Sequence, residues 1–273
     1  WAMTQNNLGS ALARLGELRM HAPTLEEAVA AYRLALEVRT RKTMPEEWAT
    51  TQHNLGGALQ LLGKMVERKE ALHDAVSSYR SALEVRSRRT VPADWATTQS
   101  NLGAALIVLG DSKSLDAAEA AISSALEVIT RDAMPAEWAM AQNNLGVILR
   151  TLGTARGSTE LLEAAVLACR KALELYVREV SPERWANSQN NLGNALFSLG
   201  KLKGETDMLN MAASAKRLAL EVYTLESTPA GWAATQSSLG AVLTLLGGLT
   251  DNAKALQEAV AAYRSSLQVN TRQ

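Results

Sequence analysis

Asparagine recurs at a nearly fixed interval along this chain, inside segments otherwise rich in helix-forming residues. The line consists of Asn7, Asn54, Asn101, Asn144 and Asn191. A carboxamide offers one hydrogen-bond acceptor and two donors, which match the C=O and N–H groups of an extended peptide. Because Asn is a poor residue for a helix interior, five of them on one line need a reason beyond helix formation. The chemistry they could perform is hydrogen bonding to a polypeptide main chain.

A second polar line lies one residue earlier. It reads Asn6, His53, Ser100, Asn143, Asn190 and Ser237. Together the two lines form what we call the asparagine ladder. Its groups could hydrogen-bond to the backbone of a bound segment at regular intervals, without recognising the side chains of that segment. The alternative is that the same groups bond to neighbouring helices and hold the protein itself together.

The structural repeat that carries the ladder can be recognised from the spacing of the tryptophans. They are 47 residues apart except for one interval of 43, and they are Trp1, Trp48, Trp95, Trp138, Trp185 and Trp232. We divide the chain into six copies, 1–47, 48–94, 95–137, 138–184, 185–231 and 232–273, which together form a single array. The third copy lacks four residues, and the spacing places this deletion in the loop between its two helices. Internal repetition of this length predicts units that bury their apolar faces by stacking.

Each copy reads as two helices joined by a polar loop. Just before the second copy, Pro45 and the acidic residues behind it mark a helix start, and Gly63 marks the end of that helix. Apolar residues then recur at helical spacing, and we expect the second helix to run to about Arg89. The sequence therefore predicts an all-α protein of twelve helices.

Composition narrows the function classes. The 273 residues include 28 basic and 28 acidic side chains, so no net charge draws the chain to nucleic acid or anionic membranes. Cys169 is the single cysteine, which excludes disulfides and is typical of a reducing, cytoplasmic setting. Residues 227–250 carry no charge, but Pro229 and the match to the other copies argue against a membrane span. The chain begins at Trp1, and we expect it to be a piece of a longer protein.

No motif for catalysis, a cofactor or a metal is present in the sequence. The chain has no Walker loop, no Rossmann glycine motif and no His-Glu-x-x-His. Its three histidines do not share a ligand spacing. We expect a non-enzymatic protein without a cofactor.

The motif within each copy resembles the tetratricopeptide repeat. The first copy carries it as Leu8, Gly9, Leu12, Ala28, Tyr32, Ala35 and Pro45. Two features depart from the family: the period exceeds the usual length of about 34 residues, and Gln stands at the family's Trp position, with Trp one turn earlier. Arrays of this long period are typical of large bacterial proteins. The resemblance implies a right-handed superhelix whose first helices line a concave groove.

The resemblance also implies which residues face that groove and meet a protein or peptide partner. Besides the ladder, the groove set adds Asn194, Ile107, Val147, Arg150 and Phe197. Phe197, the chain's only Phe, is either an anchor for a partner or a packing residue for the next copy. The basic carboxylate clamp of chaperone-binding relatives is absent, so an acidic C-terminal tail is not the expected ligand.

Two alternatives to peptide binding remain open. The final helix, around Leu256, Ala259, Val260, Tyr263 and Leu267, has no following helix to cover it, which favours self-association into a homo-oligomer. The basic residues at the ends of second helices, Arg39, Arg41, Lys42, Arg86, Arg88 and Arg89, could instead bind RNA or another anion. Nucleic acid is the less favoured partner, because basic residues are expected at helix ends and no stacking aromatics accompany them.

Overall fold

The computed structural model describes residues 1–269 and contains twelve α-helices and no strand within them. The helices form two compact units, Trp1–Ala133 and Met134–Gln273. Each unit holds three helical hairpins, and in each unit successive hairpins pack on one another. The predicted all-α fold of stacked hairpins is confirmed.

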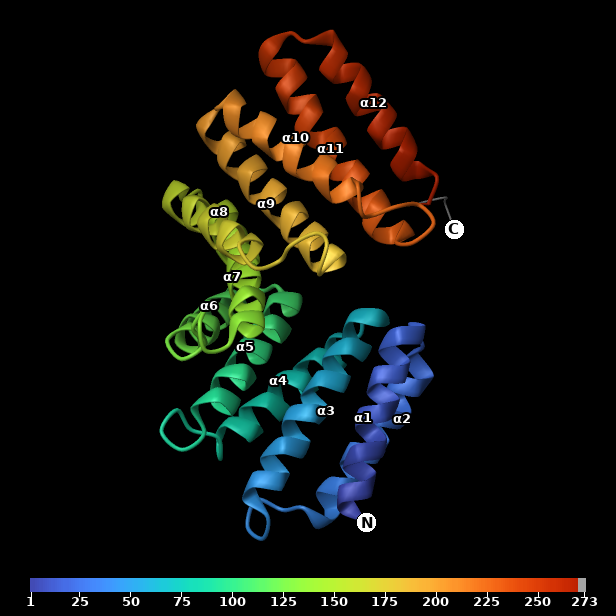
Figure 1. Ribbon diagram of the computed structural model, residues 1–273, viewed down its shortest axis with the longest axis vertical. Coiled ribbons are helices and arrows are strands. Elements are labelled where there is room, and N and C mark those ends of the chain that lie inside the picture. The colour runs from blue at the N-terminus through green and yellow to red at the C-terminus, as the bar shows by residue number, and fades with distance from the viewer. Residues whose placement is uncertain (270–273) are drawn as a thin grey trace. The chain divides into compact units, whose positions relative to one another are not determined.

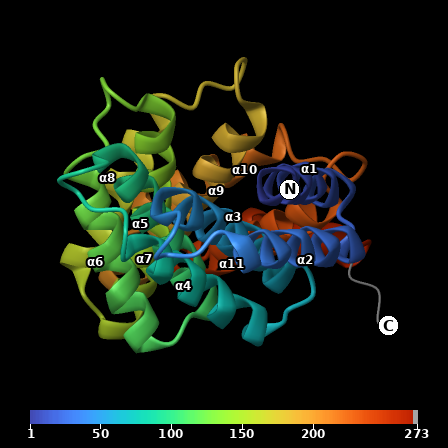
Figure 2. The same ribbon diagram turned by 90° about the horizontal axis from the view of Figure 1, so that it is seen from below.

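The N-terminal unit is built from three hairpins that follow the chain (Figures 1 and 2). They are α1 (Ala2–Arg19) with α2 (Ala22–Val38), α3 (Pro45–Met65) with α4 (Lys69–Leu83), and α5 (Pro92–Leu109) with α6 (Ser112–Leu126). Besides its hairpin partner, α3 contacts both α2 and α1, and α5 contacts both α4 and α3. The first helices thus lie next to one another.

The C-terminal unit repeats this arrangement. Its hairpins are α7 (Pro135–Arg156) with α8 (Thr159–Leu173), α9 (Pro182–Lys203) with α10 (Thr206–Leu220), and α11 (Pro229–Thr250) with α12 (Ala253–Leu267). Here α9 contacts α8 and α7, and α11 contacts α10 and α9. None of the described helices is both long enough and apolar enough to cross a membrane.

Close contact inside each hairpin depends on a glycine in the first helix. A Cβ atom on Gly56 would lie 2.9 Å from the Tyr79 ring, so only glycine fits against this side chain. The pairs that correspond to Gly56–Tyr79 are Gly9–Tyr32, Gly103–Ile122, Gly146–Cys169, Gly193–Lys216 and Gly240–Tyr263. Cys169 is fully buried. One residue of this series, Lys216, is unlike the others.

Two helix boundaries differ from the sequence prediction. The second helix of copy two ends at Leu83, because the Glu84 and Val85 amides donate three residues back, to the Ser81 and Ala82 carbonyls, and so tighten the chain into a turn. The four residues missing from copy three shorten α5, which ends at Leu109 with Gly110 in the left-handed conformation. The deletion therefore removes the last turn of the helix, while the loop to α6 keeps two residues, as in the three hairpins of the C-terminal unit.

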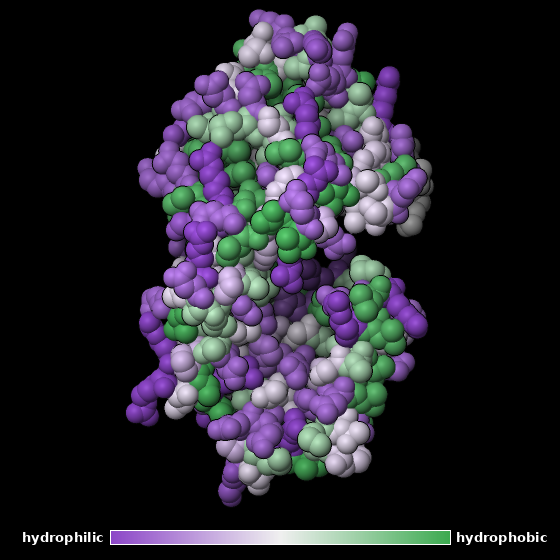
Figure 3. Space-filling model, viewed as in Figure 1, coloured by the Kyte–Doolittle hydropathy of each residue, from purple (hydrophilic) through white to green (hydrophobic). Residues whose placement is uncertain are grey.

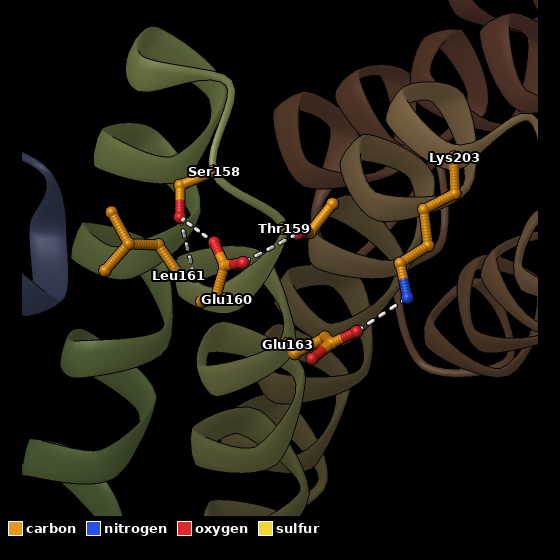
Figure 4. A network of polar contacts seen from close by, with 6 residues as sticks. All are labelled: Ser158, Thr159, Glu160, Leu161, Glu163 and Lys203. Carbon is orange, nitrogen blue, oxygen red and sulfur yellow. Dashed lines mark hydrogen bonds and ion pairs between the residues drawn. The ribbon is translucent and has the colours of Figure 1, made fainter.

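Ion pairs join consecutive hairpins on the outside of each unit. In the N-terminal unit Arg41 pairs with Glu84 and Arg88 with Glu127. In the C-terminal unit Lys203 at the end of α9 reaches back to Glu163 on α8, with Nζ 2.6 Å from the carboxylate (Figure 4). The same figure shows Ser158 capping α8 by accepting the Leu161 amide hydrogen. Exposed pairs of this kind fix register more than they add stability.

Candidate functional site

In the N-terminal unit, the ladder residues at the earlier of the two positions bridge consecutive first helices. Asn6 Oδ1 on α1 accepts from Thr51 Oγ1 at 3.2 Å and from Asn54 Nδ2 at 3.3 Å, both on α3. His53 on α3 takes the same place in the next hairpin, with Nδ1 3.1 Å from Thr98 Oγ1 and Nε2 3.4 Å from Asn101 Nδ2. The amide nitrogen of Asn101 can only donate, so His53 Nε2 must accept this hydrogen bond. His53 therefore carries its proton on Nδ1.

The C-terminal unit makes the same bridge with carboxamides. Asn143 Oδ1 on α7 accepts from Ser188 Oγ at 2.9 Å and from Asn191 Nδ2 at 3.1 Å, both on α9. Asn143 Nδ2 donates to Asn187 Oδ1 at 3.2 Å. Asn190 in turn lies 3.4 Å from the Thr235 hydroxyl on α11. These ladder groups therefore bond to neighbouring helices in both units, which is the structural use that the sequence left open.

Most of the later ladder residues direct their amide groups to the preceding helix. Asn54, Asn101 and Asn191 each donate in this way. Asn7, on the first helix of the chain, is exposed and only 3.5 Å from the Asn6 amide nitrogen. The donors that a peptide backbone would need are thus already engaged at three of the five positions.

Asn144 differs from the rest of the ladder. It is half-buried and makes no hydrogen bond within residues 1–269. It lines a pocket of about 450 Å³, which we call the Asn144 pocket. The other lining residues are Met140, Asn143, Tyr176, Glu183, Arg184, Asn187, Tyr223 and Thr228. The hydroxyl oxygen of Thr228 is buried and also has no partner in the described chain. The pocket therefore offers one carboxamide that is not engaged, whereas the Thr228 oxygen is buried and not exposed to it.

Two tyrosines give this pocket an aromatic character. Burial raises the pKa of Tyr176, and Arg184, which bonds its hydroxyl, acts in the opposite direction. Burial also raises the pKa of Tyr223, against a hydrogen bond from Asn187. Both phenols consequently keep their protons at neutral pH. The Arg184 guanidinium lies 5.9 Å from the Tyr176 ring centre, within the range of a cation–π contact.

The remaining predicted groove residues do not converge on the Asn144 pocket. Ile107 belongs to the N-terminal unit, whereas Val147, Arg150 and Phe197 belong to the C-terminal one, and all four are half-buried. Arg150 donates to Thr151 Oγ1 on its own helix. Burial lowers the pKa of Arg150, and Cys169 acts in the opposite direction.

Phe197 combines the two roles that the sequence left open. It packs against the hydrophobic core cluster of the C-terminal unit and also lines two surface pockets of about 400 and 370 Å³. It is therefore a core residue whose outer edge remains accessible.

Lys216 is a chemically unusual residue that the sequence analysis did not single out. It occupies the tyrosine position of α10 and is completely buried. Its ammonium group donates to Asn190 Oδ1 at 2.7 Å, Asn194 Oδ1 at 2.6 Å and the Asn190 carbonyl oxygen at 3.3 Å. Burial first, and then the charge of Arg150, lower the pKa of Lys216 to about 7. Comparing the six copies at the position of Tyr32 and Tyr79 would have revealed it.

The predicted basic ridge is largely engaged within the N-terminal unit. Arg39 and Arg86 point inward, are buried, and donate to Thr51 and Thr98 at 2.8 and 2.9 Å. Arg41 and Arg88 are exposed but form the ion pairs described above. Among the described residues, no group of three or more His, Cys, Asp or Glu side chains could hold a metal ion.

Comparisons with known proteins identify the repeat. The model of the tetratricopeptide repeat family matches residues 138–182, which form α7, α8 and the turn after them. No curated protein sequence matches the chain significantly.

Two crystal structures are similar in fold. BtubC (BKLC) from P. vanneervenii is 21% identical, with 91% of this chain and 93% of that chain covered and a TM-score of 0.59. PilW, a widely conserved type IV pilus biogenesis factor, is 19% identical, with 97% and 94% covered and a TM-score of 0.53. The family match confirms the resemblance of the fourth copy, and the other copies share its tryptophan and Leu-Gly positions. The chain therefore carries a tetratricopeptide repeat, a unit typical of protein-interaction scaffolds.

Proposed function

We propose that the chain is a non-enzymatic scaffold that binds an extended peptide or protein segment on the first helices of its C-terminal unit. Asn144 would hydrogen-bond the main chain of that segment, and the Asn144 pocket would receive one of its side chains. The observation that carries the proposal is the unengaged carboxamide of Asn144, which lines this pocket. Half-buried polar groups normally have partners, so an open carboxamide in a pocket favours a ligand.

The pocket has the composition expected of a peptide subsite. It combines two protonated phenols with one open carboxamide, and such aromatic surfaces are enriched where proteins bind other proteins. The proposal is narrower than binding along the whole ladder, because Asn143, Asn190 and Asn191 already hold neighbouring helices. Phe197 remains our second candidate contact, as an apolar anchor beyond the pocket. We also propose a cytoplasmic setting, which the single, buried Cys169 supports.

The test is selection of peptides from an unbiased displayed library against the 273-residue chain. Affinities of the selected peptides would then be measured by fluorescence polarisation for wild type and for Asn144→Ala. Loss of the carboxamide should weaken binding about tenfold, the effect of removing one or two hydrogen bonds. Asn7→Ala, at the equivalent position of the N-terminal unit, should leave binding unchanged. Equal affinity of wild type and Asn144→Ala would refute the proposed contact.

The same measurement separates this function from binding by the basic residues. Binding through Arg41 and Arg88 would fall steeply with salt, because displaced counterions drive such association. Binding at Asn144 should change little with salt and should survive Arg88→Glu. The two modes therefore respond oppositely to the same pair of variants.

A further inference from the structure

Within each unit, the second helix of one hairpin is covered by the first helix of the next. In the N-terminal unit α3 covers α2 and α5 covers α4, and in the C-terminal unit α9 covers α8 and α11 covers α10. This contact buries a line of apolar residues on the second helix. On α4 the line is Leu72, Val76 and Tyr79, each no more than 5% exposed.

The same line on α12 has no cover among the described residues. Leu256, Val260 and Tyr263 stand at the positions of Leu72, Val76 and Tyr79, yet they are 40%, 49% and 38% exposed. Tyr263 keeps its contact with Gly240 of its own hairpin, so the hairpin is intact and only the outer cover is missing.

The complementary face is open on α1. Leu8 is 48% exposed, whereas its equivalents Leu55 and Leu102 are 6% exposed because a preceding second helix covers them. Trp1, Leu18 and Met20 add to the apolar surface of this first hairpin. In the space-filling view, hydrophobic residues gather along the first hairpin (Figure 3). The exposed face of α1 is thus of the kind that covers a second helix elsewhere in the chain, and α12 has no such cover among the described residues.

A charge pattern specifies how the two faces would align. Arg33 on α2 pairs with Asp74 on α4, and Arg217 on α10 pairs with Glu258 on α12. Both ion pairs join the same two positions of consecutive copies. The corresponding arginine of the last copy is Arg264, and the corresponding acid of the first copy is Glu27. Both are exposed and take part in no ion pair within the described residues.

We propose that two copies of this chain associate head to tail, with α12 of one copy covered by the first hairpin of the next. The interface would repeat the contact that α11 makes with α10, and Arg264 would pair with Glu27 of the next copy. Contact between two different surfaces leaves a free end on each side, so the association is open and its extent should grow with concentration.

The test is sedimentation velocity of the 273-residue chain over a wide concentration range. The average mass should rise with concentration, and Val260→Glu should return the chain to a monomer by placing a charge in the interface. Leu167→Glu, on an equally exposed leucine of α8, is the matched control and should associate like wild type. Circular dichroism confirms that each variant folds.

Charge reversal at Arg264 and Glu27 tests the same interface independently of whether Val260→Glu folds. Arg264→Glu alone and Glu27→Arg alone should each weaken association by about tenfold, because each places like charges opposite one another. The double variant restores an opposite-charge pair and should recover association. A monomer at every concentration would overturn the proposal. So would an unchanged association of Glu27→Arg, which would indicate contact between two α12 helices instead.

Discussion

At the position that follows a second helix, the N-terminal unit carries Arg39 and Arg86, whereas the C-terminal unit carries Tyr176 and Tyr223. Arg86 donates to Thr98 on α5 and also to Thr50 on α3, so one guanidinium ties two first helices together. Tyr176 has no such reach, and its pocket is lined by carboxamides instead. The same position is therefore filled by a cation in one unit and by a neutral phenol in the other.

The difference continues at the adjacent ladder position. His53 fills it in the N-terminal unit and contacts the Tyr79 ring edge-on, with centres 5.6 Å apart. Asn143 fills it in the C-terminal unit and bonds to Ser188 and Asn191 on α9. Equivalent junctions are therefore held by different side chains on the same arrangement of helices.

Among these variants, removal of the Arg86 side chain should have the largest effect on the free energy of unfolding. Arg86→Ala deletes two hydrogen bonds in a buried junction and should lower the free energy of unfolding by about 3 kcal/mol. Arg86→Tyr, which copies the other unit, should cost less. Arg88→Ala is the control: it loses only an exposed ion pair and should cost less than about 1 kcal/mol. Chemical denaturation measures all three, and equal losses for Arg86→Ala and Arg88→Ala would contradict the role assigned to Arg86.

The second prediction concerns Lys216, which stands where the first two copies have Tyr32 and Tyr79. The folded chain releases this proton near pH 7, but the unfolded chain holds it to the ordinary lysine pKa of 10.5. Between these values the unfolded state binds more protons, so stability rises with pH. The rise from pH 7 to 9.5 should be about 2–3 kcal/mol greater in wild type than in Lys216→Met, which cannot titrate. Parallel pH profiles for the two proteins would show that the three acceptor oxygens keep the lysine pKa near normal.

His53, in the N-terminal unit, should make stability rise with pH in the same direction but in the acid range. Burial, and then the charge of Arg86, lower the pKa of His53 to about 4, while Asp94 acts in the opposite direction. The unfolded chain binds the proton from pH 6.5 downward, so stability is present above 6.5 and is lost as the pH falls towards 4. From pH 7 to 5 the loss should be about 1–2 kcal/mol. His53→Asn, which installs the residue found in three other copies, should remove this loss; an unchanged acid profile would mean that His53 is accessible to solvent when folded.

The hairpins and their stacking could be predicted because their signals are local and repeated. Trp48, Gly56 and Pro45 recur in phase, and each has a fixed effect on a helix or on its closest neighbour. The end of the second helix was wrong by several residues, because Arg86 belongs to the junction and not to the helix. The sequence does not indicate whether a basic residue that follows an apolar helix is exposed or is buried in the junction between two hairpins.

The candidate site could be predicted only in part. A carboxamide serves a neighbouring helix as well as it serves a ligand, and the partners of Asn143 on α9 lie more than forty residues away in sequence. The recurrence of asparagine therefore identified the polar line of residues, but not which of their carboxamides remain without a hydrogen-bond partner. Thr228 and Tyr223 were missed because they follow second helices, outside the segments on which the ladder lies.

The smallest expected effect separates two adjacent asparagines. Asn143→Ala removes the acceptor of Ser188 and Asn191 and should lower the free energy of unfolding by about 1–2 kcal/mol. Asn144→Ala removes no hydrogen bond and should change it by less than about 0.5 kcal/mol. Thermal or chemical denaturation of both variants gives the result directly. If Asn144→Ala is as destabilising as Asn143→Ala, its carboxamide serves the fold and the Asn144 pocket loses the group on which peptide binding depends. If only Asn143→Ala is destabilising, any loss of peptide affinity in Asn144→Ala arises from the ligand contact itself.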